Sequence, residues 1–327
     1  MTLSIQDIEQ AAARLAGHIV ATPLLSSPTL NQMSGARLWF KAENLQHTGA
    51  FKLRGALNRL LQLTEAEKHN GVVAWSSGNH AQGIAAAAKI VNTHATIVMP
   101  KDAPATKIAG TRAWGADIVF YNRQTESREV IARALADQQQ AVLVPSFDDY
   151  AVMAGQGTCG LELADQAAAL RVNLSAVIIP CGGGGLAAGV GTALRDRSPA
   201  TRIELAEPCQ FDDHARSLRH SRRESNEPGA RSICDALLAP TPGELTFPIN
   251  QSLVARVQTV TDTQVEAAIR LAHQHLKLVV EPGGAVGLAA VLNNSNTYAG
   301  EDVAIILSGG NIDQVDLLNI LNKGADS

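Results

Sequence analysis

Residues 176–196 read AVIIPCGGGGLAAGVGTALRD and contain a strand, a turn and a helix in one stretch. The apolar run AVIIP predicts a buried strand, and the residues after the glycines have the composition of a helix. Because glycine has no side chain, successive backbone N–H groups can face one anion, and a helix N-terminus favours negative charge at the same place. The stretch therefore predicts an α/β fold with a phosphate-binding turn, formed by Gly182, Gly183, Gly184, Gly185 and Leu186.

Short apolar runs alternate with helical patterns along the rest of the chain. Strand-like runs lie at residues 37–42, 71–76, 95–100, 117–122, 141–146, 203–208 and 303–307. Such alternation predicts open, twisted parallel sheets with helices on both faces. The strands are too many for one small sheet, so we predict two α/β domains. Residues 1–70 and 148–327 would form a large domain, residues 71–147 would form a small one, and the polar stretch 217–231 would be a loop.

The composition is that of an ordinary globular protein, with 46% hydrophobic and 18% charged residues among 327. A net charge of −4 and only 4% aromatic residues give no reason to expect nucleic-acid or membrane partners. The four cysteines do not form a CxxC pair, and no apolar run reaches transmembrane length. The N-terminus is amphipathic and carries Asp7 and Glu9, unlike a secretory signal, so we expect a cytoplasmic protein.

Three further loops carry groups that can do chemistry. SSGNHAQGIA, residues 76–85, places Ser76, Ser77, Asn79 and His80 at the start of a helix, where a small carboxylate could bind; simple helix capping is the alternative. VAIILSGGN, residues 303–311, ends a strand at Ser308. TGAFKLRGA, residues 48–56, carries Lys52 behind a phenylalanine.

Lys52 could be an ordinary surface lysine, but the other loops favour a chemical role. A desolvated lysine can form a Schiff base with an aldehyde. A phosphate-binding turn, a carboxylate-binding loop and such a lysine together point to pyridoxal 5'-phosphate (PLP) as the cofactor.

The segments ENLQHTGAFKLRGA, SSGNHAQGIA, PCGGGGLAAGV, EPGGAVGLAAV and SGGN together resemble the fold-type II PLP enzymes. The pattern is most similar to the threonine/serine dehydratase and serine racemase branch, and it extends from Thr22 to Asn311. The resemblance implies a tryptophan-synthase β-like fold, in which the small domain closes over the substrate, and a tendency to form homodimers.

By position, the resemblance implies a role for each matching residue. Lys52 matches the Schiff-base lysine, and Phe51 matches the residue that packs on the cofactor ring. Asn79 matches the partner of the ring hydroxyl, and Ser308 faces the ring nitrogen. Residues 182–186 match the phosphate loop. Ser77 matches a second acid/base on the opposite face, and Ser76, Asn79 and His80 belong to the loop that binds the substrate carboxylate.

The implied reaction is α,β-elimination from an L-3-hydroxy amino acid, which gives a 2-oxo acid and ammonia. Serine racemase-like members also hold a divalent cation, and the matching ligands here are Glu207, the Phe211 carbonyl and Asp213. Oxygen ligands suit Mg²⁺ or Ca²⁺, whereas a solvated acidic turn is the alternative.

Several features of the sequence bear on the substrate. Ala50 stands where many threonine dehydratases have serine, and no regulatory domain is expected after the last glycine turn, which favours a catabolic role. Arg128 in TESREV matches an arginine at the active-site mouth. It could pair with the second carboxylate of L-threo-3-hydroxyaspartate, or it could form an ordinary helix salt bridge. The stretch 231–247 also resembles dehydratases of hydroxyectoine breakdown.

Three other functions stay open on the sequence. A racemase or bifunctional racemase-dehydratase would use Ser77 to return the proton from the other face. An NAD-dependent dehydrogenase is suggested by Gly183, Gly185 and Ala188, which satisfy G-x-G-x-x-A, but it leaves Lys52 unexplained. A non-enzymatic PLP or amino-acid sensor would have no need of an acid/base pair.

Overall fold

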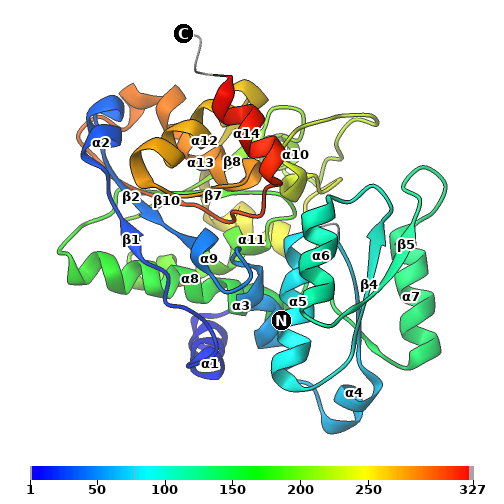
Figure 1. Cartoon of the computed structure of the whole chain (residues 1–327). Helices are drawn as coiled ribbons and strands as arrows, with labels where there is room; N and C mark the ends of the chain where they lie inside the picture. Colours follow the sequence, from blue (N-terminus) through cyan, green and yellow to red (C-terminus); the bar gives the residue numbers. More distant parts are fainter. Residues whose placement is uncertain (1, 77, 324–327) are drawn as a thin grey trace.

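The computed structural model of the protein describes residues 2–76 and 78–323. Within these ranges the strands form a six-stranded and a four-stranded sheet, each covered by helices (Figure 1). The predicted α/β class with parallel sheets is confirmed.

The six-stranded sheet has the order β1-β2-β10-β7-β8-β9. Its strands are β1 (Leu24–Leu25), β2 (Arg37–Lys41), β7 (Ala176–Pro180), β8 (Arg202–Pro208), β9 (Val254–Val260) and β10 (Asp302–Ile306). All neighbouring pairs are parallel except β1 with β2, which is antiparallel. The sequence did not predict β1, because two residues are too few to show the alternation typical of a strand.

Side chains of this sheet alternate between two apolar layers. In β7, Ala176 and Ile178 belong to the layer formed with α12 and α13, whereas Val177 and Ile179 belong to the layer formed with α8 and α9. Figure 1 shows α12 and α13 on one side of the sheet and α8 on the other. Because both faces are covered, the strands are apolar on both faces, which explains the unbroken run AVIIP.

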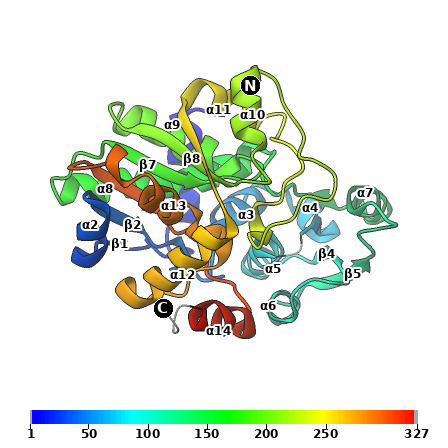
Figure 2. The same cartoon turned by 90° about the horizontal axis from the view of Figure 1, so that it is seen from above.

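The four-stranded sheet is parallel throughout and has the order β5-β4-β3-β6. Its strands are β3 (Val72–Trp75), β4 (Ala95–Pro100), β5 (Asp117–Tyr121) and β6 (Val142–Leu143). Seen from above, β4 and β5 lie with α6 and α7 on one side of the molecule, away from α2 and α13 (Figure 2). All four strands fall within residues 71–147, and the independence of that segment as a small domain stays a prediction.

The helices connect and cover the strands. Their bounds are α1 (Ile5–Leu15), α2 (Pro28–Ser34), η1 (Glu43–Leu45), α3 (Lys52–Leu60), α4 (Glu65–Asn70), α5 (Asn79–Val91), α6 (Ala105–Ala113), α7 (Arg128–Gln139), α8 (Tyr150–Ala169), α9 (Gly185–Arg197), α10 (Asp213–His220), η2 (Asp235–Leu237), α11 (Thr246–Leu253), α12 (Asp262–Leu276), α13 (Pro282–Asn293), η3 (Ser295–Thr297) and α14 (Gln314–Asn322). The predicted loop 217–231 is therefore wrong at its start, where α10 continues to His220. No helix within the described ranges is long and apolar enough to cross a membrane.

Helix α3 lies between the two sheets and packs on α5 and α8. Glycines permit these close crossings. A Cβ atom on Gly83 of α5 would lie 3.2 Å from the backbone of Lys52, and one on Gly155 of α8 would overlap the carbonyl of Arg54. The first turn of α3 is thus held from both sides, which fixes the backbone position of Lys52.

Candidate active site at the junction of the two sheets

A cavity of about 520 Å³ is lined by residues from both sheets, a size suited to a small molecule with its cofactor. It brings together the following residues that the sequence predicted for the site: Phe51, Lys52, Ser76, Asn79, His80, Arg128, Gly182, Gly183, Gly184, Gly185, Leu186 and Ser308. Ser77, also predicted, lies outside the described residues. The cavity is at the carboxyl ends of β3, β7 and β10, where ligands bind in open α/β sheets.

Lys52 is the first residue of α3 and is partly buried in the cavity wall. Its Nζ donates a hydrogen bond to the carbonyl of Ser146, 2.9 Å away. Burial lowers the pKa of the Lys52 amine to about 8, although the charge of Glu281 acts in the opposite direction. A substantial fraction of this amine is therefore neutral near pH 8, and a neutral amine is nucleophilic and basic.

The glycine turn is closely surrounded by other side chains. A Cβ atom on Gly183 would overlap the ring of Phe147, and one on Gly184, which has φ 92°, would lie 2.5 Å from Asn250 Nδ2. Thr246 Oγ1 donates to the Gly183 carbonyl at 2.6 Å, which fixes the loop from behind. Only glycine fits this backbone, and its N–H groups lie at the start of α9 beside the cavity.

The N-terminus of α5 has no side-chain cap: its N-cap residue is Gly78. Ser76 Oγ accepts instead from the Gly78 N–H at 3.1 Å, within the turn before the helix. Among the described residues, capping of α5 therefore does not explain these polar groups. The arrangement fits a site for an anion near the helix start.

His80 lies at the cavity but is buried and uncharged. Burial, together with the nearby charge of Lys52, lowers the pKa of His80 to about 3. Its Nε2 lies 3.1 Å from the Val144 carbonyl, so in the neutral ring Nε2 carries the proton and Nδ1 is an acceptor. His80 therefore supplies no positive charge to a substrate carboxylate, and its predicted role in binding stays a prediction.

Asn79 belongs to a buried polar network that the sequence analysis missed. Its Nδ2 donates to Glu281 Oε1, and its Oδ1 accepts from Asn311 Nδ2 at 2.8 Å. Glu281 precedes α13 and lies in the segment EPGGAVGLAAV, which gave a resemblance but no role. Lys107 of α6 joins the network and lies 3.6 Å from Glu281 Oε2.

Two loops from opposite ends of the chain are joined at the site. The Phe51 N–H donates to the Ser308 carbonyl at 3.1 Å, and Ala50 forms a β-bridge with Gly309. Ser308 is buried, but it lines the cavity. This junction holds Phe51 and Ser308 on neighbouring parts of the wall.

Arg128 lies at the cavity, as the first interpretation of its sequence context predicted, and it also forms a salt bridge, as the alternative predicted. It is the first residue of α7 and lines the cavity. Its Nε also donates to Glu129 Oε1 at 2.8 Å. Both side chains are partly exposed, so this surface pair is weak and leaves the guanidinium free to take another carboxylate.

The predicted metal ligands lie behind the glycine turn and outside the cavity lining. Glu207 is fully buried and accepts from the N–H groups of His214 and Ala215. His214 Nδ1 lies 3.4 Å from Glu207 Oε1 and 3.6 Å from Asp213 Oδ2. The structure thus brings Glu207 and Asp213 together but adds a histidine that the sequence analysis missed.

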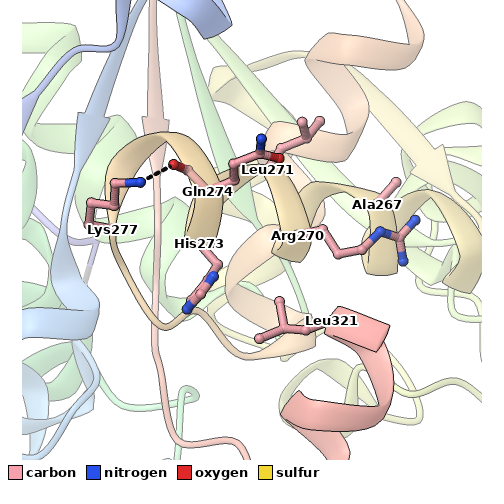
Figure 3. Close-up of a pocket in the computed structure, with 7 residues that line it drawn as sticks. All are labelled: Ala267, Arg270, Leu271, His273, Gln274, Lys277 and Leu321. Carbon is pink, nitrogen blue, oxygen red and sulfur yellow. Dashed lines mark hydrogen bonds between the residues drawn. The ribbon is translucent and has the colours of Figure 1, made fainter. Parts of the chain in front are cut away.

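A second hollow lies between α12 and α14, lined by Ala267, Arg270, Leu271, His273, Gln274, Lys277 and Leu321 (Figure 3). Its lysine donates to the Gln274 carbonyl, and Arg270 Nη1 donates to the Ile320 carbonyl. Of the site residues that were predicted from the sequence and that the structure describes, none borders this hollow. The candidate active site is therefore the cavity at Lys52.

The comparisons with known proteins agree with this geometry. Residues 15–309 match the family model described as pyridoxal-phosphate dependent enzyme, so the chain belongs to that family, whose cofactor is PLP. An L-threo-3-hydroxyaspartate ammonia-lyase from Pseudomonas sp is 44% identical over 310 residues, which are 95% of this chain and 96% of that protein.

Two solved structures have the same fold at similar length. A threonine deaminase from T.th. has a TM-score of 0.90 and 44% identity, covering 95% of this chain and 99% of that one. Maize serine racemase has a TM-score of 0.92 and 36% identity, covering 100% and 99%. The predicted family and fold type are confirmed, and the NAD-dependent alternative has no support among these matches.

Proposed function

We propose that the protein is a PLP-dependent ammonia-lyase that converts L-3-hydroxy amino acids to a 2-oxo acid and ammonia. The observation that carries the proposal is one cavity holding the Lys52 amine, with its pKa of about 8, beside the glycine turn and Ser308. The relatives support the same reaction class, because an ammonia-lyase and a threonine deaminase are similar over nearly the whole chain.

The residues present fit PLP. The turn at Gly183 and Gly184 leaves room for no side chain, and its N–H groups suit a phosphate. Lys52 would hold the aldehyde carbon, Asn79 the ring hydroxyl and Ser308 the ring nitrogen, with Phe51 packed against the ring. When bound, PLP supplies an electron sink for the bond that breaks at Cα.

Lys52 would take the proton from Cα of the substrate, because its lowered pKa makes it a base near neutral pH. The β-hydroxyl leaves with one proton as water. The released enamine then takes up water and loses ammonia, so the net products are a 2-oxo acid and ammonium. A neutral hydroxyl at Ser308 cannot balance a full positive charge on the ring nitrogen, which favours prompt elimination.

The preferred substrate that we propose is L-threo-3-hydroxyaspartate. It carries a second carboxylate, and Arg128 at the cavity is a guanidinium paired only weakly with Glu129. The Pseudomonas relative bears that substrate in its name, and serine or threonine offers no group for this arginine.

Racemisation is the second candidate, since elimination and racemisation both begin with loss of the Cα proton. The likeness to maize serine racemase favours it, and Ser77 is the residue that we would test as the second acid. Chiral analysis of recovered L-serine separates the two: appearance of D-serine supports racemase activity, and unchanged L-serine contradicts it.

We also propose a divalent cation, Mg²⁺ or Ca²⁺, at Glu207, the Phe211 carbonyl and Asp213. In support, Asp213 Oδ2 is buried and accepts no hydrogen bond within the described part of the chain. A cytoplasmic location, a homodimer and closure of the small domain stay predictions, and sedimentation analysis would test the dimer.

The decisive experiment measures release of 2-oxo acid by the purified protein with PLP and Mg²⁺. L-serine, L-threonine and L-threo-3-hydroxyaspartate are compared at equal concentration. A large preference for hydroxyaspartate supports the proposal in full, whereas a preference for serine or threonine keeps the reaction and removes the proposed specificity. No turnover of any of the three would overturn the lyase proposal.

A further inference from the structure

We propose that Glu281 is a positioning residue that fixes the amide of Asn79, and that Lys107 ties this pair to the four-stranded sheet. The inference rests on the proposed function, in which Asn79 binds the ring hydroxyl of PLP. All three side chains are nearly inaccessible to solvent, with exposures of 1% for Glu281, 6% for Asn79 and 3% for Lys107.

The orientation of the Asn79 amide follows from a chain of donors and acceptors. Asn311 Nδ2 donates to the Thr48 backbone carbonyl at 2.8 Å, so this amide is fixed by the backbone. The same Nδ2 donates to Asn79 Oδ1, and Asn79 Nδ2 then donates to the carboxylate of Glu281. An ionised carboxylate only accepts, so Asn79 must present nitrogen to Glu281 and keeps its second N–H for the cavity.

Space for the Glu281 carboxylate is made by the glycine turn after β10. A Cβ atom on Gly309 would overlap Glu281 Oε1, and the Glu281 N–H donates to the Gly309 carbonyl at 3.0 Å. The carboxylate thus lies between this turn and Asn79. A salt bridge that served stability alone would not need to lie against the amide that faces the cofactor.

Lys107 favours the ionised form of the carboxylate, which accepts hydrogen bonds. Its Nζ lies 2.5 Å from Asp235 Oδ2 and 3.6 Å from Glu281 Oε2, the second distance being an ion pair too long for a hydrogen bond. Burial raises the pKa of Glu281 to about 7, while Lys107 lowers it. Without the lysine, the pKa of Glu281 would rise further, and a protonated Glu281 would accept less strongly from Asn79 Nδ2, so the amide would keep only its contact with Asn311.

The contact joins parts of the chain that belong to different sheets. Lys107 is on α6, which packs on α5 beside the four-stranded sheet, whereas Asp235 and Glu281 lie on η2 and before α13. Any movement of the four-stranded sheet toward or away from the larger one would therefore change the contacts of Glu281 with Lys107 and with Asn79. Substrate binding between the sheets would in this way alter the ionisation of the cofactor's ring hydroxyl.

The test is a pH titration of the visible absorption spectrum of the PLP-loaded protein. The charged or titratable groups around Glu281 are Lys107, Asp235, Lys52 and Cys234. A donor to the ring oxygen stabilises its ionised form, so we expect Glu281→Gln and Lys107→Met to move the spectral midpoint to higher pH by about one unit. The double variant should shift no further than either single variant, because both act on the same amide.

Two further variants separate positioning from mere stability. Lys107→Arg keeps the positive charge and should restore most of the parent midpoint, and Lys101→Met, at an exposed lysine just before α6, should leave it unchanged. Lower melting temperatures with unmoved midpoints would overturn the inference. A parent that binds no PLP would overturn the proposed function as well, whereas an active parent with unmoved variants would overturn this inference alone.

Discussion

Arg54 and Glu43 form a two-pronged ion pair, with Nε to Oε2 and Nη2 to Oε1 both at 2.8 Å and both side chains fully buried. Arg54 lies one half-turn after Lys52 on α3 and also contacts Glu162 of α8. The pair therefore fixes the helix that presents the reactive lysine. Removing one partner would strongly destabilise the fold, because it would leave an uncompensated charge in the interior.

We expect Arg54→Met to lower the free energy of unfolding by about 3–5 kcal/mol, because Glu43 would remain buried without its partner. Urea unfolding measures this, with Arg112→Met on α6 as the exposed control. Burial raises the pKa of Glu43, but the charge and hydrogen bonds of Arg54, together with the charge of Lys41, outweigh it and lower the pKa. This contribution is therefore present above the unfolded pKa and is lost as pH falls through the folded one. A loss no larger than that of the control would contradict this role.

The lowered pKa of Lys52 makes a prediction about the pH dependence of catalysis. A base that must be neutral should make kcat rise with pH and level off above about 8. Lys52→Ala should lower kcat by at least about 10²-fold, while Lys89→Met, at an exposed position of α5, should not. A Lys52→Ala protein with parent-like turnover would remove the lysine from the chemistry.

Arg128→Ala should lower kcat/KM for L-threo-3-hydroxyaspartate by about 10- to 100-fold, the loss expected for one hydrogen-bonded charge pair. Turnover of L-serine should change little, because serine has no second carboxylate. Arg123→Ala is the matched control, since Arg123 is exposed and pairs with Asp102. Equal losses on both substrates would contradict a role of Arg128 in substrate specificity.

Gly184→Ala should weaken PLP binding by more than about tenfold, because a left-handed backbone and a Cβ 2.5 Å from Asn250 would both distort the turn. Titration with PLP, followed by absorbance, measures the affinity. A Cβ atom on Gly191 of α9 would lie 3.1 Å from Leu253 Cδ1, the end of a flexible side chain, and 3.6 Å from Ile203, an ordinary contact. Gly191→Ala should therefore bind PLP like the parent. Parent-like affinity in Gly184→Ala would show that the turn does not hold the phosphate.

Removal of divalent cations should lower the melting temperature by a few degrees if Glu207 and Asp213 hold a metal, because a ligand that binds only the folded state stabilises it. Asp213→Asn should remove that response to a chelator, and Asp165→Asn, at an exposed position of α8, should retain it. An unchanged melting temperature after chelation would contradict the proposed cation site.

The strands and loops of the site could be predicted from the sequence because their signals are local. AVIIP reads as a strand buried on both faces, and the four glycines after it need no tertiary information to mark a phosphate turn. The same holds for the polar run that begins at Ser76. Family and fold class followed from these segments and are confirmed.

The missed residues are those whose role depends on tertiary contacts. Lys107 in ATKIAGTRA looks like a surface lysine, but in the structure it is buried beside Asp235 and Glu281, which are distant in sequence. Arg54 likewise looks like a charge on an amphipathic helix, yet it is fully buried. His214 follows Asp213 in sequence, but its ring contacts Glu207, which lies on β8. The sequence alone does not show which charged side chains will be buried by contacts with distant parts of the chain.

The bridge between Ala50 and Gly309 has a consequence for synthesis of the chain. Strand β2 pairs with β10, so its inner edge has no partner until residues 302–306 have left the ribosome. All four strands of the smaller sheet, by contrast, are present once residue 143 has emerged. A nascent chain would thus contain Lys52 long before it forms the pocket that lowers the pKa of this lysine. Premature termination between β2 and β10 would leave the inner edge of β2 unpaired and prone to aggregation.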